Sequence, residues 1–127
     1  MTTKKRSTKA AAPQPAAQLF IAGPANAQGS PTPNQVLNFV VNSVALCSGY
    51  SASSISKSWV LGDPITDASG DKHPGAGLSQ HGIDICLNPK LNQLIAYFGS
   101  TNTIPAGTYS TTSTIADVAD DVGQRIP

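Results

Sequence analysis

The first 33 residues constrain the fold of this chain most, because they cannot build a core of their own. Five prolines interrupt this stretch, and its first eighteen residues hold no large apolar side chain after Met1. Such a segment buries too little apolar surface to offset the entropy lost on ordering. We therefore predict an extended basic, Pro-rich arm over residues 1–33 and a compact domain over residues 34–127. The free arm should be disordered and become ordered only against neighbouring molecules.

One short apolar stretch interrupts the arm. Leu19, Phe20 and Ile21 are the only large apolar residues between Met1 and Val36. On an otherwise polar arm they predict an anchor that docks on the chain's own body or on a partner. An edge strand within the domain's own sheet is the alternative.

Charge divides the chain into a basic arm and a mildly acidic body. The arm cations are Lys4, Lys5, Arg6 and Lys9, with no acidic residue among them. The rest of the chain carries four cations against seven Asp residues, which leaves the body at −3 although the whole chain carries +1. This asymmetry predicts an anionic partner for the arm, either packaged nucleic acid or the acidic body of a neighbouring copy.

The remaining composition indicates a surface that partners cover. Only 12% of the residues are charged, about half the usual share. A weakly charged surface gives little protection against self-association. No apolar run approaches the roughly 18–20 residues that cross a bilayer, so no membrane partner is expected.

The first regular element should be a helix. Thr32 is a good N-cap, and Gln35 three residues later completes a capping box. Pro33 suits the first helical position, so the helix should run from Pro33 to about Cys47. Its many valines also allow a strand, and Gly49 should end either element.

Two further helices are expected. One should begin at Asn88 and Pro89 and stop at Gly99, with its apolar residues at helical spacing. Those residues are Leu91, Leu94, Ile95 and Phe98. The other should cover residues 114–122, capped by Ser113, ended by Gly123 and made marginal by two acids at its negative pole. Its apolar face comprises Ile115, Val118, Ala119 and Val122.

β-structure should fill the middle of the domain. Residues 59–61 predict a strand, and residues 65–73 predict a hairpin with Gly70 in its turn. The alternating apolar residues of 83–87 predict another strand, and residues 103–110 a turn that enters a strand. The expected fold is a small single α+β domain, with two or three short amphipathic helices on a short, mostly antiparallel sheet.

The two cysteines, Cys47 and Cys86, each lie in apolar sequence. This context favours two buried free thiols; a disulfide is the alternative, because sequence alone does not show whether the two meet. With His73 and His81 they match no zinc-finger spacing, so no metal site is expected.

One motif comes close to catalytic chemistry. Residues 77–81, GLSQH, differ by one residue from a G-x-S-x-G nucleophile elbow, because His81 replaces the final glycine. Ser79 and His81 would need a third group to orient the imidazole, and Asp84 is the nearest acid. We expect a glycine-rich loop here, no catalytic residues, no cofactor and no enzymatic activity.

Three aspartates recur every four residues: Asp63, Asp67 and Asp71. They lack the alternation and the terminal Glu of a calcium loop, and the chain contains no Glu. The predicted hairpin accounts for them better than a calcium site does.

A secretory signal fits the start of the chain poorly. Residues 4–9 resemble a basic n-region and residues 25–27 a small-residue cleavage site, but three prolines break the stretch between them. We therefore expect no cleaved signal.

Together these features predict a non-enzymatic structural component of a large assembly, a virus or phage virion protein such as a minor capsid or cement protein. The basic Ala/Pro/Gln-rich arm resembles those of small capsid-associated proteins, and this likeness is compositional and limited to the arm. It implies docking on other subunits, either copies of itself or a major capsid protein, or contact with packaged nucleic acid.

Two other functions compete with this prediction. The first alternative is a secreted or surface-displayed binding module with a Cys47–Cys86 disulfide. The second is a small nucleic-acid-binding protein that works through its arm, although a dedicated binder usually spreads cations over a folded face.

Overall fold

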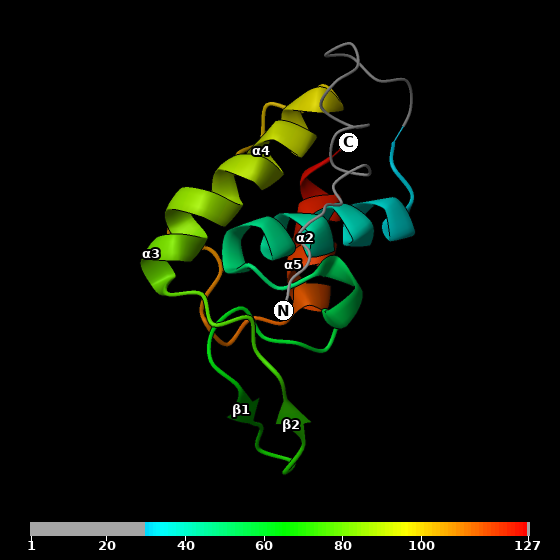
Figure 1. Cartoon of the computed structure of the whole chain (residues 1–127). Helices are drawn as coiled ribbons and strands as arrows, with labels where there is room; N and C mark the ends of the chain where they lie inside the picture. Colours follow the sequence, from blue (N-terminus) through cyan, green and yellow to red (C-terminus); the bar gives the residue numbers. More distant parts are fainter. Residues whose placement is uncertain (1–29, 127) are drawn as a thin grey trace.

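Helix α2 (Pro33–Ser48) forms where its capping residues predict it (Figure 1). The structure is a computed structural model and describes residues 30–126. The hydroxyl of Thr32 accepts the backbone N–H of Gln35, and the Gln35 side chain accepts the Thr32 N–H, so the capping box is present. Gly49 ends the helix in the left-handed conformation, at φ 87°.

The predicted arm lies almost entirely outside the described residues. This holds for the arm cations and for the apolar anchor: Lys4, Lys5, Arg6, Lys9, Leu19, Phe20 and Ile21. Their roles stay predictions.

A continuous helical rod replaces the loop and strand expected at residues 80–87. It comprises α3 (Gln80–Gly82), a π-helical segment η2 (Ile83–Leu87) and α4 (Asn88–Tyr97). The strand prediction is wrong, because Ile83 and Leu87 are fully buried while Ile85 is 60% exposed. The two buried residues are four apart, a helical spacing that the alternation in the sequence concealed.

The second helix starts earlier than predicted. Its N-cap is Ser79, whose hydroxyl accepts the Gly82 N–H at 3.0 Å, and Asn88 lies inside the rod. A proline ring within a regular α-helix collides with the carbonyl four residues earlier. The π turn, in which Asn88 donates to the Ile83 carbonyl, directly precedes Pro89 and widens the helix for its ring.

The predicted apolar face of α4 is confirmed. Leu91, Leu94 and Ile95 are fully buried and Phe98 is half-buried. The rod stops at Gly99, which adopts φ 82° and donates to the Ala96 carbonyl.

Helix α5 (Ile115–Arg125) starts later and extends further than predicted. Thr114, not Ser113, is its N-cap and accepts a backbone N–H of the first turn. Asp121 lies near the negative end of the helix, but Arg125 Nε donates to its carboxylate at 2.7 Å. This ion pair offsets the unfavourable negative charge of Asp121 near the C-terminus of the helix, the reason the sequence predicted a helix of marginal stability. The predicted buried face is confirmed: Ile115, Val118, Ala119 and Val122.

β-structure is shorter than predicted. Strands β1 (Ile65–Thr66) and β2 (Lys72–His73) pair antiparallel as expected, and Gly70 takes φ 88° in the turn between them. Residues 108–113 form turns where a strand was expected after the 103–110 turn.

The strand predicted at residues 59–61 is reduced to isolated bridges. Val60 pairs parallel with Gly75 and antiparallel with Thr114. Its N–H donates to the Pro74 carbonyl at 2.9 Å, and the neighbouring Leu61 N–H donates to the Ser113 carbonyl. One extended segment therefore joins the loop before α3 to the loop before α5.

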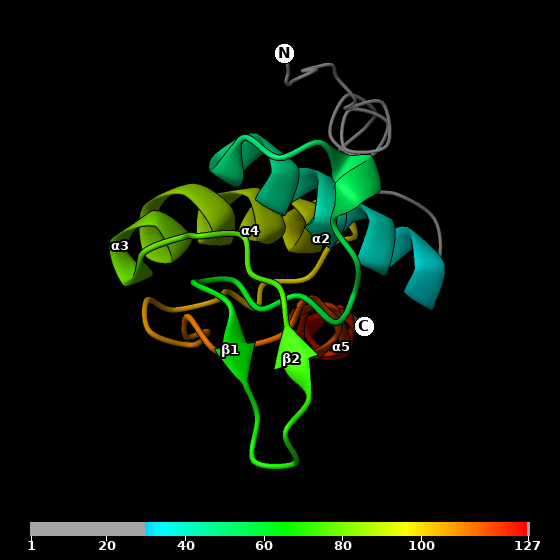
Figure 2. The same cartoon turned by 60° about the horizontal axis from the view of Figure 1, so that its bottom comes forward.

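The helices pack against one another, and the hairpin projects away from them (Figures 1 and 2). The core includes side chains from every main helix: Val36, Phe39, Val40, Val44, Ile83, Leu87, Leu91, Leu94, Ile95, Ile115, Val118, Val122 and Ile126. A short 3-10 turn, η1 (Ala52–Ser54), follows α2. The predicted small single α+β domain is confirmed, although its helices cover each other more than they cover the sheet.

The expectation of two free thiols is wrong: Cys47 and Cys86 form a disulfide with Cα atoms 5.9 Å apart. Cys47 lies in the last turn of α2 and Cys86 in the π segment. Packing of the rod against α2 brings Cys47 and Cys86 together. The sequence did not indicate this contact because residues 83–87 were expected to form a strand.

Close backbone approach requires glycine at the Val60 bridge. A Cβ atom on Gly75 would collide with the carbonyl oxygen of Gly62 and lie within 2.8 Å of backbone atoms of Asp63 and Pro64. These obstacles are all backbone, so relief requires the two segments to separate.

The Gly75→Ala variant should therefore lose about 2–4 kcal/mol of unfolding free energy, measured by urea denaturation. Gly123→Ala is the matched control, because a Cβ atom there meets nothing within 4 Å and the position is helical. The control should gain roughly 0.5–1 kcal/mol. Equal stability of the two variants would contradict the close approach of Gly75 to the backbone of residues 62–64.

Candidate interaction surfaces

The first candidate surface comprises exposed apolar residues that lie close to the bonded cysteines in sequence. Leu46 and Ile85 immediately precede the bridged Cys47 and Cys86, and Tyr50 follows just after α2. Leu46, Tyr50 and Ile85, here called the disulfide patch, are 55%, 48% and 60% exposed. They are the large hydrophobic side chains that residues 30–126 leave exposed. Burial of each by a partner would contribute roughly 1.5–3 kcal/mol before ordering costs.

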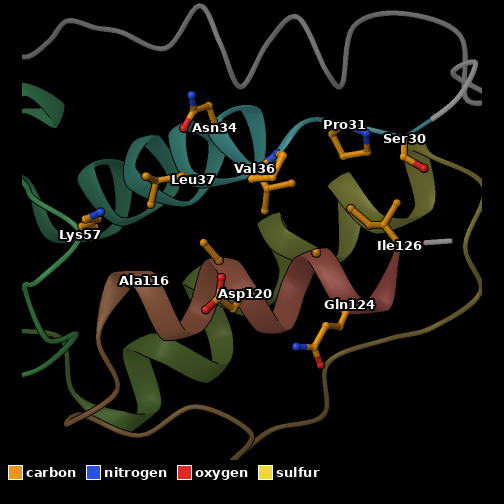
Figure 3. Close-up of a pocket in the computed structure, with 13 residues that line it drawn as sticks. Ser30, Pro31, Asn34, Val36, Leu37, Lys57, Ala116, Asp120, Gln124 and Ile126 are labelled. Carbon is orange, nitrogen blue, oxygen red and sulfur yellow. The ribbon is translucent and has the colours of Figure 1, made fainter.

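The second candidate surface is a pocket of about 600 Å³ between the N-terminal half of α2 and helix α5 (Figure 3). We call it the α2–α5 groove. Its lining comprises Ser30, Pro31, Pro33, Asn34, Val36, Leu37, Lys57, Ala116, Ala119, Asp120, Gly123, Gln124 and Ile126. A volume of this size lies within the range of roughly 300–1,000 Å³ typical of ligand sites.

The groove has a mixed lining that includes one charge of each sign. Val36 and Leu37 of α2 point toward α5 (Figure 3), and the buried Ala119 of α5 is also a lining residue. Lys57 and Asp120 supply the charges. Ser30, Asn34 and Gln124 are further polar lining residues, so an occupant meets both apolar and polar groups and no net charge.

The predicted Ser79–His81 motif is used for folding. The Ser79 hydroxyl accepts the Gly82 N–H as the N-cap of α3, and the His81 side chain is exposed. Asp84, the nearest acid in sequence, accepts the Gln80 amide at 3.2 Å and the Gly107 N–H at 3.0 Å. The carboxylate therefore connects the rod to the 103–110 turn.

His73 attaches the hairpin to the body. Its Nε2 lies 2.9 Å from Asp67 Oδ2, and its Nδ1 lies 2.8 Å from the Ser58 carbonyl. Both ring nitrogens face acceptors, so only the doubly protonated imidazolium donates both hydrogen bonds. The Asp67 carboxylate and the Ser58 carbonyl accordingly raise the pKa of His73 above its ordinary 6.5, and the His73 hydrogen bond lowers the pKa of Asp67.

A second network fixes the loop before α5. The Tyr109 hydroxyl donates to Asp121 at 2.6 Å, and the Arg125 guanidinium donates to both Asp121 and the Thr103 carbonyl. Burial, and then the Asp121 carboxylate, raise the pKa of Tyr109. Burial alone would raise the pKa of Asp121, but the hydrogen bonds from Arg125 and Tyr109 lower it.

The candidate metal ligands are dispersed or already used. The two cysteines are bonded to each other, and His73 is paired with Asp67. Oδ1 of Asp67 accepts the N–H groups of Ser69 and Asp71, as a hairpin turn requires. Over residues 30–126 no group of three His, Cys, Asp or Glu side chains is placed to hold a metal ion. In the same span, no helix is long and apolar enough to cross a membrane.

Comparison with known proteins finds no matching family model, no matching curated protein and no matching solved structure.

Sequence reasoning missed both candidate surfaces. The disulfide patch depends on the contact between α2 and the π segment, and misassignment of residues 83–87 concealed that contact. The groove depends on two helices that lie about 80 residues apart in sequence. The one sequence feature that points to the groove is Gly123. Glycine is unfavourable within a helix, and yet Gly123 lies within α5.

Removal of the disulfide should destabilise the domain. Chain-entropy estimates for a bond across 39 residues give about 4 kcal/mol. The Cys47→Ser, Cys86→Ser double variant should lose roughly 3–4 kcal/mol of unfolding free energy in urea. Reductant should lower the wild type to the same value and leave the double variant unchanged. A loss below about 1 kcal/mol would show that the bond does not constrain the chain.

His73 makes stability pH-dependent with a defined sign. Because its pKa is raised on folding, its stabilisation is complete below pH 6.5 and disappears as pH rises through the folded-state pKa. The stability advantage of the wild type over His73→Gln should therefore shrink between pH 6 and pH 9 in urea titrations. His81→Gln, at an exposed histidine of α3, should follow the wild type throughout. A constant gap between wild type and His73→Gln would contradict the imidazolium assignment.

Proposed function

We propose that this chain is a non-enzymatic structural component of a large assembly, a virion protein of the minor capsid or cement type. One observation carries the proposal: a domain closed by a disulfide exposes large apolar side chains at residues close in sequence to the bonded cysteines. Disulfides persist in oxidising surroundings, which include virion surfaces. Exposed apolar patches mark surfaces that other proteins cover. The proposed occupant of the disulfide patch is a neighbouring subunit of the same assembly.

Three polar side chains near the candidate motifs make hydrogen bonds that stabilise the fold, which supports a structural role. Ser79 caps a helix, Asp84 joins the rod to a turn, and Asp67 closes the hairpin. These side chains stabilise local structure, and their hydrogen bonds hold them in that arrangement.

Charge supports an arm that reaches outward. Four aspartates on the described body are exposed: Asp63, Asp71, Asp117 and Asp120. A body of this charge complements the four arm cations of a neighbouring copy, and packaged nucleic acid offers the same complementarity. Four exposed cations make only a modest, salt-sensitive contribution in either case.

The second candidate is a secreted or surface-displayed binding module. The Cys47–Cys86 bond favours it as well, because secreted proteins also keep their disulfides. The two candidates differ in the fate of the arm: secretion requires cleavage after Ala27, whereas the assembly role requires the arm to be retained.

Fractionation of native material tests the proposal. On a density gradient, the chain should sediment with particles at a fixed ratio to the major subunit. Its intact mass should include residues 1–27 and be lower than that of the reduced chain by two hydrogens. Recovery as a free protein that lacks residues 1–27 would overturn the assembly role in favour of the secreted module.

Arm variants should show that packing outweighs charge in incorporation. Burial of Leu19, Phe20 and Ile21, on the chain's own body or on a neighbouring subunit, fixes the arm and contributes roughly 5–8 kcal/mol before ordering costs, far more than four exposed cations. At physiological salt, replacement of these three by Ser should reduce incorporation into particles by at least about tenfold.

Replacement of the four arm cations by Gln is the comparison variant and should reduce incorporation less. Far-ultraviolet circular dichroism confirms that both variants fold. If the charge variant alone fails to incorporate, the arm binds an anion, and nucleic-acid contact becomes its main role.

A further inference from the structure

Helix α5 contributes a residue without a side chain to the lining of the α2–α5 groove. Gly123 lies within α5 and lines the groove, and a Cβ atom there would meet nothing within 4 Å. Glycine inside a helix is unfavourable, by about 1 kcal/mol relative to alanine. No close backbone contact explains its presence, and Gly123 lies one helical turn after Ala119, on the face of α5 that lines the groove.

The described chain begins at this groove. Ser30 and Pro31 are among its lining residues and lie beside the start of α2 (Figure 3). Whatever precedes Ser30 in the sequence is therefore tethered to the mouth of the groove. A tether of a few residues gives a segment a millimolar effective concentration at a neighbouring site.

One apolar segment lies within reach. Leu19, Phe20 and Ile21 are the only large apolar residues between Met1 and Val36. Eight residues lie between Ile21 and Ser30, and a chain across these nine Cα–Cα steps extends up to about 30 Å.

Charge is also compatible with this occupant. Residues 10–29, which contain the apolar segment, carry no charged side chain. The groove lining is part apolar and part polar, and its two charged residues, Lys57 and Asp120, have opposite signs. An uncharged segment with apolar side chains is compatible with this lining, which has no net negative charge to attract the cationic stretch at residues 4–9.

We propose that the α2–α5 groove receives Leu19, Phe20 and Ile21 of the same chain. Docking of this segment fixes the base of the arm on α2 and α5. The nine residues between Lys9 and Leu19 then act as a tether that projects the arm cations away from the body. This assignment does not depend on the identity of the partner that the cations meet.

Methyl-NOE spectroscopy on the full-length protein tests the proposal. Cross-peaks are expected from the Leu19 and Ile21 methyl groups and the Phe20 ring to the methyl groups of Leu37 and Ala119. A sample that mixes isotopically labelled and unlabelled chains separates contacts within one chain from contacts between copies. Intermolecular cross-peaks would overturn the proposal in favour of a second copy, and absence of cross-peaks to the groove would overturn it outright.

A groove-filling variant provides an independent readout. Gly123→Leu should place a side chain in the groove without disturbing the core, and should reduce the cross-peaks from Phe20 at least twofold. Gln93→Leu is the matched control, since it adds the same side chain at an exposed position of α4 and should leave the cross-peaks unchanged. Unchanged core methyl shifts, read at Val44 and Leu94, confirm that each variant folds. Equal cross-peaks in the two variants would contradict the assignment.

Discussion

The packing of α2 against its neighbouring helices is the interaction on which the rest of this structure depends. The sheet is a two-residue-per-strand hairpin, so it contributes little to the core. The fully buried Phe39, Val40 and Val44 of α2 belong to the same cluster as the apolar faces of α4 and α5. Because a domain of about 100 residues buries a limited fraction of its surface, loss of this helix packing would leave no second core to sustain the fold.

The disulfide adds a covalent restraint at the C-terminal end of α2. It joins the last turn of that helix to the π segment, the least regular part of the rod. The π segment exists beside Pro89, so the bond and the proline act on the same stretch of chain. Ile85 lies in this π segment next to the bonded Cys86, and its side chain is exposed.

The two candidate surfaces lie toward opposite ends of α2. The groove begins near Val36 and the disulfide patch includes Leu46, ten residues or about 15 Å along the helix. A segment docked in the groove therefore leaves the patch available for a neighbouring subunit. This separation allows one small domain to hold its own arm and to contact a partner at the same time, as the proposed assembly role requires.

The sequence by itself determined the features that depend on neighbouring residues. The capping box at Thr32 and Gln35, the glycine stop of α2 and the hairpin around Gly70 all arise from contacts within a few positions, and all are confirmed. The apolar faces of α4 and α5 were likewise readable, because helical spacing identifies the side that is buried.

Tertiary structure alone decided the rest. Ile83, Ile85 and Leu87 alternate like a strand, and only packing against α2 selects the helix that buries the first and last of them. The same contact brings Cys47 to Cys86, which lie 39 positions apart and offer no local signal of their bond. The groove likewise forms only when α2 and α5 are placed side by side, because distant pairings depend on the whole core and not on any one segment.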